Sequence, residues 1–176
     1  MAMENMDLDA NEIKELDVES SFFGVAYSNG KLFLADRWTS RVYKLNLSNG
    51  KFNIITESSL IEPYCLTVDE NYLYVASTKN HSVIIYDKAT LERVNAITEI
   101  EGYGKIGEIR GISLFGNNLY LSDFSKNTVI IVDKATFELV DTIWDYFNGV
   151  EAAIATEDYI FVADRFNYEI DIYDAE

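Results

Sequence analysis

The sequence predicts an all-β protein made of four similar units, and three observations support this. First, one pattern repeats four times, starting at Leu32, Leu73, Leu119 and Ile160, with spacings of 41, 46 and 41 residues. Second, β-branched and aromatic residues dominate the runs of each unit, whereas Asn, Gly, Asp and Lys dominate the gaps, as is typical of strands joined by turns. Third, runs such as YLYVAS and TVIIVD are apolar on both sides, so these strands need cover on both faces. Four-stranded units of this period with two buried faces are typical of a β-propeller, in which each unit is a blade.

The first unit contains four predicted strands separated by turn residues. The strands are residues 23–28, 31–36, 41–46 and 51–56. Asn29-Gly30 and Asn49-Gly50 separate the first from the second and the third from the fourth, and Asn-Gly is a strong hairpin signal. The other units follow the same plan, and Pro63 is the only proline in the chain.

Small residues mark the innermost strand of each unit, eight positions before the repeat start: Gly24, Cys65, Gly111 and Ala152. Blades converge at the propeller axis, where neighbouring backbones approach closely and small side chains relieve the crowding. Cys65 is the only cysteine, which excludes an intramolecular disulfide, and its apolar neighbours predict a buried thiol.

The fourth unit has only three strands, because the sequence stops at Ala175 and Glu176, where the second and third units continue into a fourth strand. Residues 13–18, IKELDV, could supply the missing strand and close the ring. We therefore expect a flexible acidic N-terminus over residues 1–12 and one propeller domain over residues 13–176. Its repeats cover about residues 19–59, 60–105, 106–147 and 148–176 plus 13–18. Two alternatives stay open: two chains that share an eight-bladed ring, and a chain that is a piece of a longer propeller.

The chain is strongly acidic, with 30 acidic and 14 basic residues and a formal charge of −16. Nucleic acid is therefore not an expected partner, because its phosphates would be repelled on average. No apolar run is long enough to span a membrane, and the acidic first residues do not resemble a secretory signal, so we expect a cytoplasmic protein and no membrane partner. A monomer and a homodimer are both compatible with the sequence.

The candidate ligand site lies on the face that carries the loops entering each inner strand, because binding groups gather on loops held by a rigid scaffold. The residues directly before the small inner positions do not repeat, unlike the structural positions around them. We expect the ligand-binding residues to be Phe23, Tyr64, Arg110, Glu151, Arg37, Trp38 and Arg165. Aromatic rings and guanidinium groups would suit an acidic small molecule or a peptide. The alternative is that Arg110 pairs with Glu151 and the aromatic rings fill a narrow channel.

Catalytic and metal-binding signals are weak. His81 is the only histidine, which excludes Ser-His-Asp chemistry, a Cys-His pair and a zinc site built from histidine and cysteine. Asp36, Asp123 and Asp164 repeat at the end of the second strand, where we expect them to accept hydrogen bonds from turn amides rather than to bind a cation. We expect no cofactor and no metal site.

The segments LFLAD, LYVAS, LYLSD and IFVAD, with the preceding FGVAYSNGK and RGISLFGNN, resemble NHL-type and YVTN-type propeller repeats. This resemblance covers nearly the whole chain from about residue 13 and implies the propeller fold. Members of these families range from protein-interaction platforms to lactonases and lyases. The expected function is therefore a binding or interaction module. The alternatives are a metal-assisted hydrolase or lyase of the lactonase-like kind, and a structural half-ring that dimerises.

Overall fold

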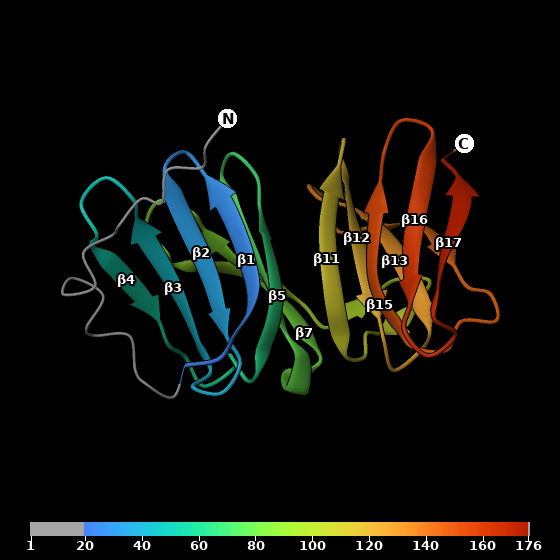
Figure 1. Cartoon of the computed structure of the whole chain (residues 1–176), viewed down its shortest axis with the longest axis horizontal. Coiled ribbons are helices and arrows are strands. Elements are labelled where there is room, and N and C mark those ends of the chain that lie inside the picture. Colours follow the sequence, from blue (N-terminus) through green and yellow to red (C-terminus); the bar gives the residue numbers. More distant parts are fainter. Residues whose placement is uncertain (1–19, 176) are drawn as a thin grey trace.

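Strands that follow one another in sequence pair antiparallel and form four sheets, each a propeller blade (Figure 1). The structure is a computed structural model and describes residues 20–175. Blade 1 consists of β1 (Phe22–Ser28), β2 (Lys31–Asp36), β3 (Arg41–Asn46) and β4 (Phe52–Ile55). Blade 2 consists of β5 (Pro63–Val68), β6 (Tyr72–Ser77), β7 (Ser82–Asp87) and β8 (Arg93–Ile97), with the 3-10 turn η1 (Thr78–Asn80) between β6 and β7.

The second half of the chain repeats this plan. A small hairpin of β9 (Glu99–Ile100) and β10 (Gly104–Lys105) precedes blade 3. Blade 3 consists of β11 (Ile109–Phe115), β12 (Asn118–Asp123), β13 (Thr128–Asp133) and β14 (Leu139–Ile143). Blade 4 consists of β15 (Val150–Ala155), β16 (Tyr159–Asp164) and β17 (Glu169–Asp174). The predicted all-β propeller of four blades is therefore confirmed.

Turn chemistry explains why the strands end where they do. Asn29 and Gly30 both have positive φ, 49° and 73°, which is the geometry of a type I′ hairpin turn. In the outer turns, the Asp87 carboxylate accepts hydrogen bonds from the backbone N–H groups of Ala89 and Thr90 at 2.9 and 2.8 Å. Asp133 does the same for Ala135 and Thr136, at 2.8 and 2.9 Å. The two copies of the sequence DKAT are therefore two copies of one turn.

The inner strands β1, β5, β11 and β15 contact one another in this order along the concave side of the molecule. Their backbones approach so closely that a Cβ atom on Gly111 would lie 2.8 Å from Ala152 Cα, and one on Gly24 would lie 2.9 Å from Cys65 Cα. This confirms why small residues occupy the inner column. Burial also raises the pKa of the Cys65 thiol well above its usual range, as expected for an unreactive cysteine.

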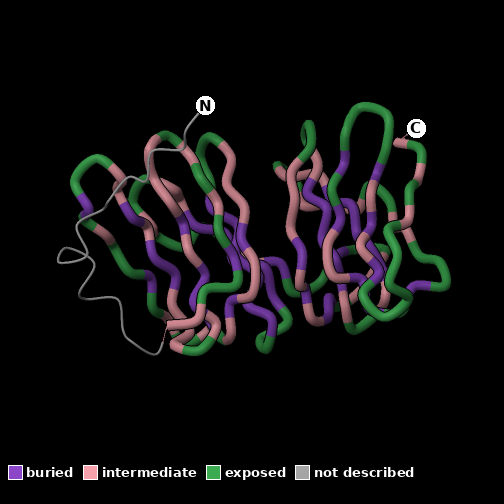
Figure 2. Tube along the Cα trace, in the orientation of Figure 1, coloured by how far each residue is buried: buried purple, intermediate pink, exposed green. Residues whose placement is uncertain are grey.

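The hydrophobic core is divided into three clusters, one between each pair of consecutive blades. Phe33 and Val42 of blade 1 pack with Leu66 and Val75 of blade 2, and equivalent clusters join blades 2 and 3 and blades 3 and 4. In Figure 2 the buried segments concentrate between blades, whereas β17 has no buried residue. Among the described residues, β15 and β1 do not pack along each other as the other inner strands do. The four blades therefore form an arc, with β1–β4 at one end of the molecule and β15–β17 at the other (Figure 1).

Residues 13–18, which could supply a fourth strand, lie outside the described residues, as does the predicted N-terminus over residues 1–12. No helix within residues 20–175 is long and apolar enough to cross a membrane.

Candidate functional site

Each inner strand carries a register irregularity at the position that does not repeat in the sequence. The pairing of β1 with β2 shifts between Phe22 and Gly24, and the pairings of β11 and β15 shift in the same way around Arg110 and Glu151. In blade 2 the shift spans Pro63 to Leu66 and so includes Tyr64. Such bulges re-aim side chains and are frequent next to binding sites. We call the residues gathered along this edge the central row: Phe23, Arg37, Tyr64, Arg110, Phe124, Glu151, Arg165 and Phe166.

Glu151 is the hub of the central row. The Tyr64 hydroxyl donates a hydrogen bond of 2.6 Å to Glu151 Oε1. Two guanidinium groups lie against the other oxygen, with Arg110 Nη1 at 3.4 Å and Arg165 Nη1 at 3.5 Å from Oε2. Burial, and then the hydrogen bond to Glu151, raises the pKa of Tyr64. Side chains from blades 2, 3 and 4 therefore share one carboxylate.

Arg110 lies in the middle of the row, between two aromatic rings. Its guanidinium carbon is 3.3 Å from the centroid of Phe124 and 5.5 Å from that of Tyr64. A second carboxylate, Glu108, has Oε2 3.5 Å from Arg110 Nη2. A hydrogen bond from Lys79 at 2.9 Å, together with Arg110, holds the pKa of Glu108 below its usual value against the opposing effect of burial. The contact between Arg110 and Glu151 that the alternative interpretation predicted is therefore present.

Arg37 extends the row into blade 1. Its Nε and Nη2 atoms donate hydrogen bonds of 3.0 and 2.9 Å to Glu62 Oε2. The same guanidinium group lies 5.2 Å from the ring centroid of Phe23 and 5.5 Å from that of Tyr64. The Phe23 and Tyr64 rings are themselves in contact, with centroids 5.1 Å apart.

Six of the seven predicted site residues therefore meet in one network. The exception is Trp38, whose side chain is exposed and makes no described contact with the row. Phe124 and Phe166 were not among the predicted site residues. The structure brings these two rings together, with centroids 6.0 Å apart. The three arginines differ in accessibility, since 51% of the Arg165 side chain is exposed, compared with 33% for Arg37 and 17% for Arg110.

The repeated aspartates act as predicted, as acceptors for turn amides. Asp36 Oδ1 accepts hydrogen bonds from the backbone N–H groups of Ser21, Trp38 and Thr39 at 3.0 to 3.3 Å. Although burial opposes its ionisation, hydrogen bonds from Thr39 and Ser21 hold the pKa of Asp36 below its usual value. In the following turns, Asp123 accepts from Lys126 N at 3.2 Å and Asp164 accepts from Asn167 N at 3.4 Å. The two carboxylates also accept from the loops before the inner strands, from Gly107 N at 2.7 Å and Asn148 N at 2.8 Å.

The spacing from Leu73 to Leu119 is five residues longer than the other two, and this longer segment contains the β9–β10 hairpin. Ile100 and Ile106 of this segment are buried in the core between blades 2 and 3. The Tyr103 hydroxyl donates to Asp123 Oδ2 at 3.2 Å, and Lys126 Nζ lies 4.5 Å from the Tyr103 ring centroid. This segment is therefore packed against blade 3 beside the central row.

One group of acidic side chains in the described part of the chain could bring oxygen atoms to a cation: Asp164, Glu169 and Asp171, whose candidate ligand atoms lie within 4.8 Å of one another. Partial burial, with Asp164 and Asp145 nearby, raises the pKa of Asp171. The Asp164 carboxylate is already engaged by Asn148 N and by Asn167 Nδ2 at 2.9 Å. This group lies in blade 4, where Asp164 directly precedes Arg165 of the central row.

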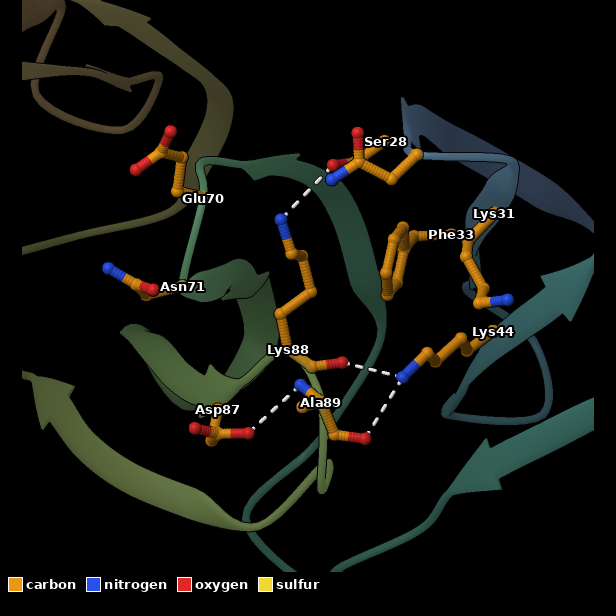
Figure 3. Close-up of a pocket in the computed structure, with 10 residues that line it drawn as sticks. Ser28, Lys31, Phe33, Lys44, Glu70, Asn71, Asp87, Lys88 and Ala89 are labelled. Carbon is orange, nitrogen blue, oxygen red and sulfur yellow. Dashed lines mark hydrogen bonds between the residues drawn. The ribbon is translucent and has the colours of Figure 1, made fainter.

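A groove of about 360 Å³ lies between blades 1 and 2, at the opposite ends of the strands from the central row (Figure 3). Sequence reasoning missed it, although Lys44 occupies a repeat column that holds isoleucine in the other three blades. Lys44 Nζ donates to the backbone oxygens of Lys88 and Ala89 at 2.6 and 3.0 Å. Lys88 Nζ donates to Ser28 Oγ at 3.1 Å and to the Asp69 carbonyl oxygen. These ammonium groups therefore cap turn carbonyls of this chain.

No family model matches this chain, and no curated protein matches it in sequence. Several solved structures resemble it. The computationally designed Ika4 protein matches with a TM-score of 0.71 and 12% identity, over 90% of this chain and 93% of the designed one. The computationally designed Ika8 protein matches with a TM-score of 0.69 and 12% identity, over 88% of this chain and 46% of that chain. The RRP9 WD40 repeats match with a TM-score of 0.71 and 12% identity, over 89% of this chain and 52% of that chain.

These similarities support the β-propeller fold. The chain spans about half the length of the Ika8 and RRP9 structures. They do not single out the NHL or YVTN type of repeat, because one of the similar structures is described as WD40 repeats.

Proposed function

We propose that this protein is a binding module whose ligand site is the central row, and that it takes a peptide or small molecule with an acidic group and an apolar or aromatic group. The observation that carries this proposal is the recurrence of bulges in all four inner strands, each at a residue that departs from the repeat. Residues that serve packing repeat from blade to blade, because each blade packs against its neighbours in the same way. Four irregularities at one edge, bearing four different side chains, fit a recognition surface better than a packing need.

The chemistry of the row suits such a ligand. Phe23 and Phe166 are about half exposed and offer apolar area, while Arg165 and Arg37 keep part of their guanidinium groups accessible to a carboxylate. Recognition of an acidic partner by this chain needs local positive charge, since its overall charge is −16. Arg37, Arg110, Arg165 and Lys79 supply that charge beside Glu62, Glu108 and Glu151. The similarity to the RRP9 WD40 repeats fits a role as an interaction module.

The row does not suit the metal-assisted alternative. Glu151 is the only acidic member of the column that faces the propeller axis, and Arg110 and Arg165 lie against it. Two guanidinium groups repel a divalent cation and already satisfy the carboxylate. Metal analysis after equilibrium dialysis tests this directly, because a stoichiometric cation removed by a chelator would favour the enzyme.

The binding proposal is tested with Arg165→Ala, because Arg165 is the most exposed arginine of the row and its loss should disturb the fold least. An array of short peptides that vary in acidic and aromatic content identifies a probe, and fluorescence polarisation then measures its affinity. We expect Arg165→Ala to weaken binding about tenfold, the scale of one charge-assisted hydrogen bond.

Arg93→Ala is the matched control. Arg93 is also about 40% exposed and also lies near a glutamate, with its Nη1 3.6 Å from Glu57 Oε1, but it belongs to the outer strand β8. Equal losses for both variants, or no peptide bound by the unmodified chain, would contradict the proposal. Arg110→Ala is less clean, because this more buried side chain also holds Phe124 and Glu151 in place, and we expect it to lower both affinity and stability.

A further inference from the structure

Each blade has two faces, which we name by what they pack against. The trailing face packs against the following blade, and the leading face packs against the preceding one. In blade 2, Val83 and Ile85 lie on the trailing face with Tyr74, whereas Ile84 and Val75 lie on the leading face. The three internal interfaces of this molecule all join one trailing face to one leading face. Among residues 20–175, blade 4 therefore has a trailing face, and blade 1 a leading face, with no partner blade.

The trailing face of blade 4 carries the same kind of side chains that are buried elsewhere. The register of β15, β16 and β17 places these on it: Ile154, Tyr159, Phe161, Ala163, Ile170 and Ile172. Ile170 is 66% exposed, whereas Val42, Val83 and Val129 in the same column are completely buried. Ile172 is 60% exposed, whereas Ile85 in its column is 1% exposed. A blade that ended in solvent would gain nothing from these apolar side chains.

The leading face of blade 1 shows the complementary pattern. Val25 and Tyr27 of β1 are 66% and 62% exposed, whereas Leu66 and Ala153, which occupy the Val25 column in blades 2 and 4, are buried. Across β2 and β3 the same face continues with Leu34 and Tyr43. Tyr43 is covered by the rings of Phe22 and Phe52, but Ile54 in β4 remains 43% exposed. The face is thus apolar along all four strands and open at its inner edge.

The two open faces are of the kinds that pack together in this fold, but they cannot meet within the arc. Blade 1 and blade 4 lie at opposite ends of the arc, and their inner strands β1 and β15 do not pack along each other among the described residues (Figure 1). A second arc of the same curvature completes the circle, and its own leading and trailing faces then meet those of the first.

We infer that two copies of this chain close one eight-bladed ring, the trailing face of blade 4 in each copy packing on the leading face of blade 1 in the other. The symmetry is a closed two-fold with two identical heterologous interfaces, so no apolar face is left to start a filament. Each new interface repeats the packing found between blades 1 and 2. The closed ring also places two central rows around one channel, so the proposed ligand site is completed by the partner copy. The ring itself does not depend on the proposed function.

The test is the mass in solution, measured by light scattering over a concentration series, for the chain and two variants. Val25→Glu places a charge on the leading face, and Ile172→Glu places one on the trailing face. Since each face occurs in both interfaces of the ring, we expect either variant alone to raise the dimer dissociation constant roughly 100-fold by burying an unpaired charge. Val140→Glu is the matched control, because Val140 is similarly exposed but lies in the outer strand β14. Circular dichroism confirms that each variant keeps its strands.

Mixing the two variants shows which faces pair with each other. A mixed pair can form one unmodified interface, between the trailing face of the Val25→Glu copy and the leading face of the Ile172→Glu copy, so association should partly return. If only one variant dissociates, each face pairs with itself and the inference is wrong. A monomer at every concentration, or an assembly that keeps growing beyond a dimer, would also overturn it.

Discussion

Blades 2 and 4 share one sequence pattern but differ in their surroundings. Blade 2 has a neighbour on both faces, and the strands β6 and β7 are buried almost throughout. Within the described part of the chain, blade 4 is flanked only by blade 3, and its strand β17 has no buried residue although it repeats the pattern of β7. The difference teaches that the burial of a propeller strand is set by the neighbouring blade. The apolar composition of the strand indicates only that cover is needed.

The largest effect is expected from a pair of substitutions in one repeat column. Ile85→Ala removes three buried carbons between blades 2 and 3 and should cost about 2–5 kcal/mol of unfolding free energy. Ile172→Ala changes an exposed side chain and should cost less than about 0.5 kcal/mol at concentrations where the chain is monomeric. Urea unfolding followed by circular dichroism measures both. Equal losses in the monomer would mean that blade 4 is covered by some other part of the chain.

A smaller effect is expected where inner strands touch. A Cβ atom on Gly111 would meet the backbone of Ala152 and Glu151 at 2.8 and 2.9 Å, so Gly111→Val should push β11 and β15 apart and cost roughly 1–3 kcal/mol or more. Ala152 has no described blade on its trailing side, and Ala152→Val should be nearly neutral in the monomer. Thermal melts at low protein concentration compare the two. A tolerated Gly111→Val would contradict the close packing of the inner strands.

The smallest effect on stability is expected from tyrosine ionisation, which changes the unfolding free energy only at alkaline pH. Burial, followed by the hydrogen bond to Glu57, raises the pKa of Tyr86 in blade 2, and burial with Asp145 raises that of Tyr173 in blade 4 to about 12. A tyrosine whose pKa is higher in the folded than in the unfolded state contributes stability that is present below about pH 10 and is lost as the pH rises further. Unfolding free energy should therefore fall above pH 10.

Substitution by phenylalanine separates the two tyrosines. Tyr86→Phe should flatten the alkaline loss of stability more than Tyr173→Phe, because Tyr86 is buried between two blades and Tyr173 is only partly covered. Urea titrations between pH 8 and pH 11 measure this. Identical pH profiles for the two variants would contradict the deeper burial of Tyr86.

Much of the fold follows from local sequence signals. Asn29-Gly30 requires positive φ at both positions, and the aspartates in DKAT accept turn amides three residues away or less, so neither feature needs distant contacts. The small residues of the inner strands could also be predicted from the sequence, since each blade places one residue where the backbones converge. Much of the candidate site was visible as the column that fails to repeat.

Contacts between side chains of different blades could not be predicted from the sequence in the same way. Tyr64 and Glu151 are 87 positions apart, and their hydrogen bond depends on blade 2 and blade 4 both reaching the concave edge. Trp38 was grouped with the site by its position in a loop, but a loop residue can point away from the axis. The groove beside Lys44 left a signal, a lysine in an isoleucine column, but only the structure shows that two backbone carbonyls accept hydrogen bonds from its ammonium group.

The sequence by itself determined the strands, their turns and the number of repeats, because these depend on alternation, hairpin chemistry and contacts a few residues apart. Only the tertiary structure decided the curvature of the arc, the pairing within the central row and which faces remain open. The physical reason is that a blade's apolar pattern specifies that both faces must be covered. The angle between packed blades, accumulated over four units, decides whether the cover comes from the same chain.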